Sequence, residues 1–242
     1  MCTVTFIPVK DKIFITSNRD EKISRKNAIL PAMKQLNGWN LIYPKDAAAG
    51  GSWIGVNENG NASVLLNGAF ICHTSEPPYR KSRGIMFLEM LSANYPAWKF
   101  SKTDLIGIEP FTLIIFENHS LYEFRWDGIE KYCKQLSNTR PHIWSSATLY
   151  DGLVVKKREQ WFAKFLNRTP KPTQHDIMNF HMLSGDGDCR NDLMMERDGI
   201  YSTVSITSIL LNDDRAVMKY HDLKKDKTSE IKIELINKIQ AL

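Results

Sequence analysis

The sequence predicts an α+β protein rich in strands, and three observations support this prediction. Runs of β-branched and aromatic residues recur along the chain, as is typical of strands. Between these runs, a few longer stretches carry apolar residues at helical spacing. The 242 residues, 43% of them hydrophobic, supply enough apolar material for a large core, and no repeat or linker divides them. We therefore expect one domain over residues 1–242.

The first strands form a hairpin. Residues 3–8 and 13–17 are apolar and β-rich, and the segment between them is polar enough to turn. A two-residue turn at its centre sets a register in which Cys2 faces Arg19. The other expected pairs are Val4 with Ser17, Phe6 with Ile15, and Pro8 with Ile13.

The later elements follow from the same patterns. Residues 22–37 are basic and irregular, 68–80 and 185–199 read as loops, and Asn59-Gly60 marks a tight turn. The expected strands are 39–43, 52–56, 62–66, 111–116, 121–126, 129–136, 142–147, 202–212, 215–221 and 229–235. The expected helices are 83–94 with Ser82 as its N-cap, 151–166, and 174–183 with Thr173 as its N-cap.

Cys2 is the first candidate for chemistry. Removal of Met1 would leave it a free α-amine, whose ordinary pKa of about 7.7–8.0 lets it act as a base for its own thiol. A nearby Arg19 would favour the thiolate. The alternative for Cys2 is a small buried hydrophobe. The polar run Asn18-Arg19-Asp20-Glu21, which ends the second strand, is either part of such a site or a salt-bridge cluster at the strand end.

Met1-Cys2 followed by Asn18-Arg19-Asp20-Glu21 resembles the NRDE family, also called the transport-and-Golgi-organisation family. More distantly, the chain is similar to N-terminal-nucleophile acylases such as bile-salt hydrolases and penicillin acyltransferases. Residues 51–57, 65–67, 82–84 and 201–208 also match, in order. The resemblance implies a four-layer αββα sandwich, two antiparallel sheets covered by helices.

The chain departs from the family pattern at two places. Ser145-Ser146-Ala147 stands where members usually carry Ser-Asn-Ala. Ser202-Thr203-Val204-Ser205 stands where many members carry an arginine. The pocket that the resemblance implies therefore lacks one amide and one cation.

Two functions follow from the resemblance. In the first, Cys2 attacks an amide, ester or thioester carbonyl and forms an acyl-enzyme, as in a hydrolase or acyltransferase. Arg19 and Asp20 would position the amine and thiolate, and Asn67 would hold the oxyanion. Substrate contacts would fall on Asn18, Glu21, Trp53, Asn57 and Ser146. In the second, the protein is a non-catalytic carrier or trafficking protein for haem or an acyl lipid.

Two of these residues have structural alternatives. Asn67 precedes Gly68, so it equally suits a turn cap. Trp53 is either the wall of a pocket or an ordinary core tryptophan.

Composition bears on partners and location. The net charge of +5 is spread along the chain, and Lys156-Lys157-Arg158 reads as a solvated helix face, so we expect no nucleic-acid groove. No apolar run reaches the roughly 20 residues of a membrane span. Without a secretion signal, a cytoplasmic location is expected. The partner would be a small-molecule substrate or an apolar ligand; oligomeric state is not predicted.

The cysteines and histidines indicate no metal site. The four cysteines are far apart, which suits neither a disulfide framework nor zinc. Residues 186–192 begin like a calcium loop, but Arg190 stands where an oxygen ligand is needed. We expect no metal and no cofactor.

Overall fold

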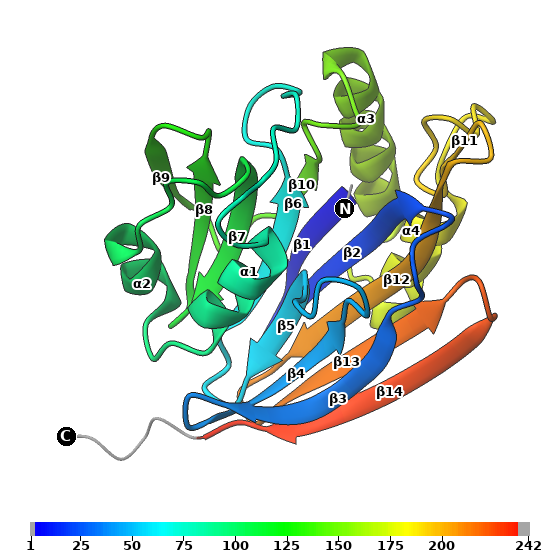
Figure 1. Cartoon of the computed structure of the whole chain (residues 1–242). Helices are drawn as coiled ribbons and strands as arrows, with labels where there is room; N and C mark the ends of the chain where they lie inside the picture. The colour runs from blue at the N-terminus through cyan, green and yellow to red at the C-terminus, as the bar shows by residue number, and fades with distance from the viewer. Residues whose placement is uncertain (1–2, 237–242) are drawn as a thin grey trace.

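The computed structural model describes residues 3–236. Two antiparallel sheets of seven strands each stack face to face, and helices cover their outer faces (Figure 1). The four-layer αββα sandwich implied by the resemblance is therefore confirmed.

The first sheet contains both ends of the described chain. Its order is β10-β1-β2-β12-β13-β14, with β11 paired to β12. The strands are β1 (Thr3–Val9), β2 (Lys12–Lys22), β10 (His142–Ser145), β11 (Glu196–Arg197), β12 (Tyr201–Leu211), β13 (Arg215–Asp222) and β14 (Lys227–Glu234). The two longest strands, β2 and β12, lie side by side at its centre.

The second sheet follows chain order from β3 to β9, because short turns join successive antiparallel strands. Asn37 and Gly38 between β3 and β4 both have positive φ, as a two-residue hairpin turn requires. The strands are β3 (Ile29–Leu36), β4 (Trp39–Lys45), β5 (Ile54–Asn57), β6 (Ala62–Asn67), β7 (Phe111–Glu117), β8 (Ser120–Trp126) and β9 (Lys131–Leu136).

Two helices cover each sheet. The second sheet is covered by α1 (Arg83–Leu91) and α2 (Pro96–Lys102), whose apolar residues pack with those of β4, β6, β7 and β8. The first sheet is covered by α3 (Gly152–Arg168) and α4 (Gln174–Leu183). The expected N-caps Ser82 and Thr173 are confirmed by their side-chain hydrogen bonds to the first turns of α1 and α4.

The main core lies between the sheets. Alternate residues of each strand point into it, such as Val4 and Phe6 of β1 and Ile15 of β2. The residues between them, such as Ile7 and Phe14, pack under α3 and α4 instead. This alternation decides which side chains of β2 can face a site between the sheets.

The opening hairpin has the expected register: Val4 pairs with Ser17, Phe6 with Ile15, and Pro8 with Ile13. Other elements agree with expectation to within a few residues. Residues 22–37 are not irregular throughout, since 29–36 form β3. This edge strand contains Pro31 and no fully buried residue, so the usual strand pattern is hidden. The chain also forms α2 and β11, for which the patterns gave no signal, and α1 ends at Leu91 rather than near residue 94.

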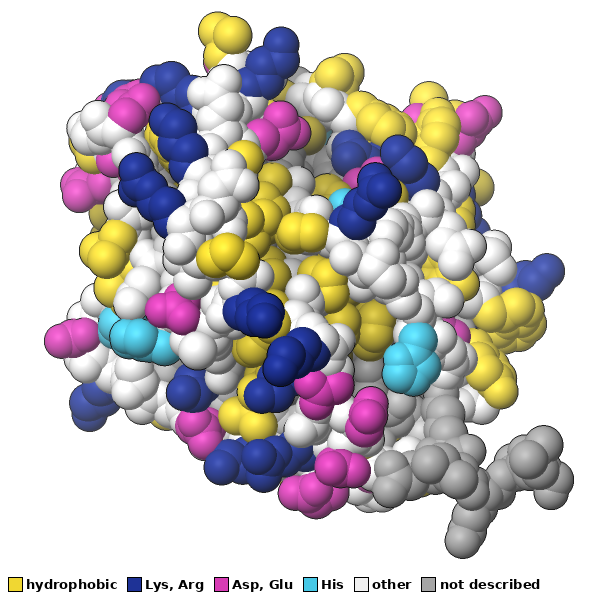
Figure 2. All heavy atoms as spheres, turned by 180° about the vertical axis from the view of Figure 1, so that it is seen from behind, with side chains coloured by type: hydrophobic (Ala, Val, Ile, Leu, Met, Phe, Trp, Pro, Cys, Tyr) yellow, Lys and Arg dark blue, Asp and Glu magenta, His cyan; other side chains and the backbone are white. Residues whose placement is uncertain are grey.

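Figure 2 shows the molecule from behind. Hydrophobic side chains form a hollowed band down the middle of this face, and basic and acidic side chains are interspersed around it. Charge of one sign therefore does not gather on this face. Among residues 3–236, no helix has the length and apolar character needed to cross a membrane.

Candidate functional site

A cleft of about 430 Å³ opens where the end of β2 meets the loop between β4 and β5, the end of β6 and the start of α1. Four residues singled out in the sequence line it: Arg19, Glu21, Trp53 and Asn67. The other charged lining residues are Arg25, Asp46, Lys81, Arg83 and Glu109.

Arg19 is fixed on one wall of this cleft. Its side chain is only 4% exposed, and its guanidinium lies 4.4 Å from the centroid of the Trp53 ring. Nη2 donates to Oδ2 of Asp46 at 2.5 Å and lies 3.7 Å from Glu21. Stacking and ion pairing together fix its orientation, so Arg19 holds a positive charge at a defined place.

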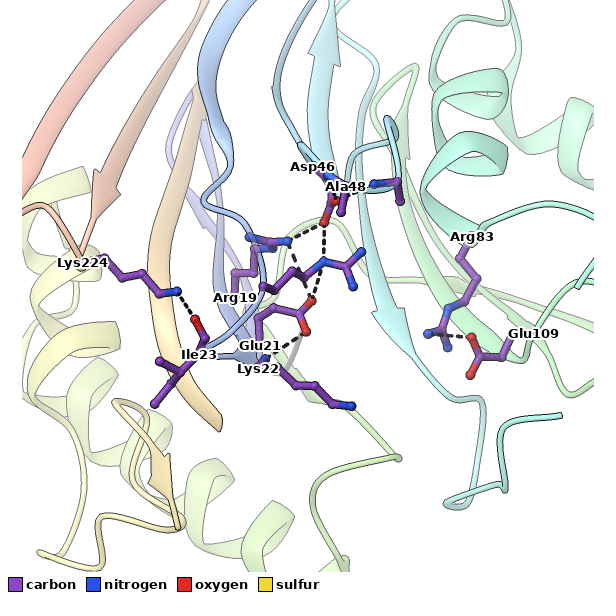
Figure 3. A network of polar contacts seen from close by, with 11 residues as sticks. Arg19, Glu21, Lys22, Ile23, Asp46, Ala48, Arg83, Glu109 and Lys224 are labelled. Carbon is purple, nitrogen blue, oxygen red and sulfur yellow. Dashed lines mark hydrogen bonds and ion pairs between the residues drawn. The ribbon is translucent and has the colours of Figure 1, made fainter. Parts of the chain in front are cut away.

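Asp46 is the anchor of this wall (Figure 3). One oxygen accepts the backbone N–H groups of Ala48 and Ala49, and the other accepts Arg19 and Nε of Arg25 at 3.0 Å. Burial acts to raise the pKa of Asp46. The hydrogen bonds from Arg25 and Ala49 and the charges of both arginines outweigh it and hold that pKa below its ordinary value. Asp46 is therefore a carboxylate at neutral pH.

The facing wall carries a second ion pair, Arg83 with Glu109 at 2.9 Å, and Figure 3 shows it across the gap from Arg19, Glu21 and Asp46. Arg83 also donates to the carbonyl of Pro110, and Glu109 accepts from His73 at 3.2 Å. Burial lowers the pKa of Arg83, the charge of Glu109 opposes this effect, and the charge of Arg25 adds to it. The two walls therefore interact electrostatically.

Two glycines let these walls approach. A Cβ at Gly51 would lie 2.2 Å from the carbonyl carbon of Gly84, and the N–H of Ser52 donates to the Gly84 carbonyl at 3.1 Å. The start of α1 thus rests directly on the backbone before β5, which the Ala47–Gly51 run of small residues permits.

Asp20 lies on the opposite face of the sheet from Arg19, since successive strand residues alternate. Its carboxylate accepts the hydroxyls of Tyr150 at 2.9 Å and Thr203 at 2.6 Å, and the residue is 4% exposed. A β-bulge in β12 falls directly opposite, between Thr203 and Ser205. Such irregularities are frequent next to functional sites.

Asn18 faces the same helix-covered side and does not line the cleft. Its amide donates to the carbonyls of His181 and Leu193, and its Oδ1 lies 2.5 Å from Nδ1 of His181. These bonds tie β2 to α4 and to the loop after it. Asn18 was predicted to contact the substrate. In the structure its side chain instead joins β2 to α4 and the following loop.

Asn67 lines the cleft, and its side-chain amide makes no hydrogen bond to another described residue. Its carbonyl accepts the hydroxyl of the buried Ser146 at 2.8 Å, so Ser146 supports Asn67 from behind. Asn57 lies elsewhere. Its amide donates to the carbonyl of Leu91, and its Oδ1 accepts the N–H groups of Asn59 and Asn61, so it holds the β5–β6 turn.

Cys2 lies outside the described residues, and so does its predicted pairing with Arg19. The last described pair of the hairpin is Thr3 with Asn18, next to Arg19 in sequence. The hydroxyl of Thr3 accepts a hydrogen bond from Arg158 of α3.

The prediction that Arg158 lies on a solvated helix face is wrong. Arg158 is completely buried rather than solvated, its guanidinium lies 3.5 Å from the Tyr150 ring centroid, and it donates to the carbonyls of Asn191 and Asp192. A signal was present, since Arg158 stands four residues from both Val154 and Phe162 on the buried stripe of α3.

Four further charged residues of the cleft, for which the sequence patterns indicated no role, come from loops: Arg25, Asp46, Lys81 and Glu109. Arg83 belongs to the block 82–84 that carried the resemblance, but no role followed from it. Within the described part of the chain, no cluster of three or more His, Cys, Asp or Glu residues is arranged to hold a metal ion.

The fold is that of the N-terminal-nucleophile hydrolases. Penicillin V acylase from Agrobacterium tumefaciens superposes with a TM-score of 0.60 at 11% identity, over 96% of this chain and 86% of that one. A mutant conjugated bile acid hydrolase from Clostridium perfringens superposes with a TM-score of 0.59 at 12% identity, over 96% of this chain and 92% of that one. The Caenorhabditis elegans ortholog of N-acylethanolamine-hydrolyzing acid amidase has a TM-score of 0.59 and 14% identity, over 86% of this chain and 92% of that one.

Residues 1–222 match the family described as Transport and Golgi organisation 2, and the chain belongs to that family. No curated protein sequence matches it. At such low identities, the structural neighbours establish the fold alone.

Proposed function

We propose that this protein is an N-terminal-cysteine hydrolase or acyltransferase that acts on an amide, ester or thioester bond through an acyl-enzyme on Cys2. One observation carries the proposal. The first described residue of β1, Thr3, pairs with Asn18, directly beside the fixed Arg19 in the wall of the cleft.

The alternation of β1 supports a thiol at this cleft. Val4 and Phe6 point between the sheets, as do Ile15 and Arg19 of β2. If the same period continues one residue before Thr3, the side chain of Cys2 joins this set. Arg19 then favours the thiolate from the cleft side, and Asp20 would position the α-amine from the other face.

The reaction balances with these groups. The α-amine takes the thiol proton, the sulfur attacks the carbonyl carbon, and Asn67 donates its amide N–H to the developing oxyanion. Collapse breaks the bond to the leaving group, which takes the proton from the amine. Water or another acceptor then cleaves the thioester and frees Cys2.

The test has two parts. Intact mass of the protein from its native host should show loss of Met1, because a retained Met blocks the α-amine. Turnover of a panel of acyl amides, esters and thioesters should be abolished in Cys2→Ala. Turnover should persist in Cys133→Ala, whose exposed cysteine lies on β9. Retained Met1, or undiminished turnover in Cys2→Ala, would contradict the proposal.

A carrier for haem or an acyl lipid is the alternative use of the same cleft. Charged side chains outnumber apolar ones in its lining, where Trp53 and Leu65 are the large apolar residues. This lining favours the enzyme over a carrier of an apolar ligand. A spectral shift on titration with haem would support the carrier function. No shift would rule out a haem carrier.

A further inference from the structure

We propose that the substrate of this cleft carries an anionic head group, a carboxylate or a phosphate, which binds between Arg25 and Arg83. The inference rests on the proposed function, whose substrate it describes more narrowly. Three features of the cleft support it: the state of its acids, the spare donors of its walls and the placement of its two arginines.

The acids of the cleft are already occupied by the protein. Asp46 accepts four hydrogen bonds, two on each oxygen. Glu109 accepts from His73 on one oxygen and is paired with Arg83 on the other. Glu21 accepts the N–H of Lys22 and lies 3.4 Å from Nε of Arg25. These carboxylates have little capacity left to bind a cationic ligand.

The donors of the cleft are not all occupied. Arg25 uses only Nε, with Asp46 and Glu21, so its two terminal nitrogens have no partner among the described residues. Its side chain is 35% exposed and therefore accessible. Trp53 is 2% exposed, and its indole N–H is buried without a hydrogen bond to the described part of the protein. Because that nitrogen has no exposed surface, the spare donors that a ligand in the cleft can reach are those of Arg25.

The two arginines come from opposite walls. Arg25 follows β2, whereas Arg83 opens α1, and both line the same cavity. Glu109 pairs with Arg83, but the lining as a whole carries four basic side chains against three acidic ones. Two guanidinium groups that repel each other across a cavity are both relieved by an anion between them, and the planar fork of arginine suits a carboxylate or a phosphate.

Binding can be measured without catalysis. Titration calorimetry on Cys2→Ala protein would compare three probes with chains of equal length: N-lauroylglycine, dodecyl phosphate and the neutral N-lauroylethanolamine. We expect at least one anionic probe to bind roughly tenfold more tightly than the neutral one. The two anionic probes separate a carboxylate source from a phosphate source.

Variants locate the effect. Arg83→Gln and Arg25→Gln should each remove most of the preference for the anion and leave the affinity for the neutral probe unchanged. Arg25→Gln keeps the test valid if Arg83→Gln folds poorly, because Arg25 is half-exposed. Arg190→Gln is the control, since Arg190 pairs with Asp198 on the surface outside the cleft.

Equal affinity for charged and neutral probes, or no binding of any probe, would overturn the inference. So would a preference that survives both arginine substitutions. Because the protein in this experiment lacks the Cys2 thiol, the result does not depend on catalysis. A preference for anions together with failure of the turnover test would refute the proposed reaction and leave the anion site standing.

Discussion

His181 shows how one buried residue links stability to pH. It lies on α4, fully buried, with Nε2 2.8 Å from the Thr5 hydroxyl and Nδ1 2.5 Å from Oδ1 of Asn18. Burial, and then the charge of Arg158, lower the pKa of His181 from 6.5 to about 3. The folded protein therefore holds this imidazole neutral at neutral pH.

We predict that this histidine destabilises the protein as the solution is acidified. Between pH 6.5 and about 3 the unfolded chain binds a proton that the folded protein does not, so the free energy of unfolding falls by up to about 1.4 kcal/mol per pH unit. The difference between the free energies of unfolding at pH 7 and pH 5, measured by urea denaturation, should be smaller in His181→Gln than in the unsubstituted protein. His175→Gln, on the exposed face of α4, should keep it.

Other residue roles depended on information absent from the local sequence. Asn18 and Asp20 lie two residues apart on one strand face, which the period of a strand predicts. That Asn18 would bond to α4, and Asp20 to Tyr150 and Thr203, depends on segments more than 120 positions away. The motif therefore identified an important strand end, but it could not show which distant segments its residues would contact.

At the scale of elements, the junction of α1 with the β4–β5 loop decides the geometry of the cleft. Ser82, Arg83 and Gly84 line it because Gly51 and Gly84 touch through their backbones. The N-cap at Ser82 was predictable from the sequence. The contact was not, because close backbone approach leaves only small residues as a signal.

We predict that Gly51→Ala separates these two elements. The added Cβ would meet the backbone of Gly84, which cannot move as a side-chain end can, so unfolding should become easier by about 1–3 kcal/mol. The affinity for anionic probes should fall as well, since Arg83 moves with α1.

Gly152→Ala is the matched control, because a Cβ at that position has no neighbour within 4 Å. Denaturant midpoints of the two variants measure the difference. An unchanged midpoint in Gly51→Ala would mean that the contact of α1 with this loop does not contribute to stability.

At the scale of the whole molecule, Arg158 connects three distant segments. From α3 it donates to Thr3 at the start of β1 and to the carbonyls of Asn191 and Asp192, and it packs on Tyr150. A buried guanidinium is tolerated only where its donors are satisfied, so these contacts depend on one another.

We predict that Arg158→Ala destabilises the protein by about 3 kcal/mol, because it leaves buried carbonyl and hydroxyl groups without donors and removes the packing on Tyr150. Lys156→Ala, on the exposed side of the same helix, should change stability by less than about 0.5 kcal/mol. Chemical denaturation of both variants provides the measurement. A small loss in Arg158→Ala would show that water replaces the guanidinium.

The sequence by itself determined the hairpin register, most strands, three helices with two of their caps, and the place of Arg19 at a strand end. These features depend on period, turn chemistry and capping, which act between residues close in the chain. Tertiary structure alone decided that Asp46, Arg83 and Glu109 complete the cleft, that Asn57 holds a turn, and which distant groups the buried Arg158 contacts. Those outcomes depend on which distant segments pack together, and no local pattern records that packing.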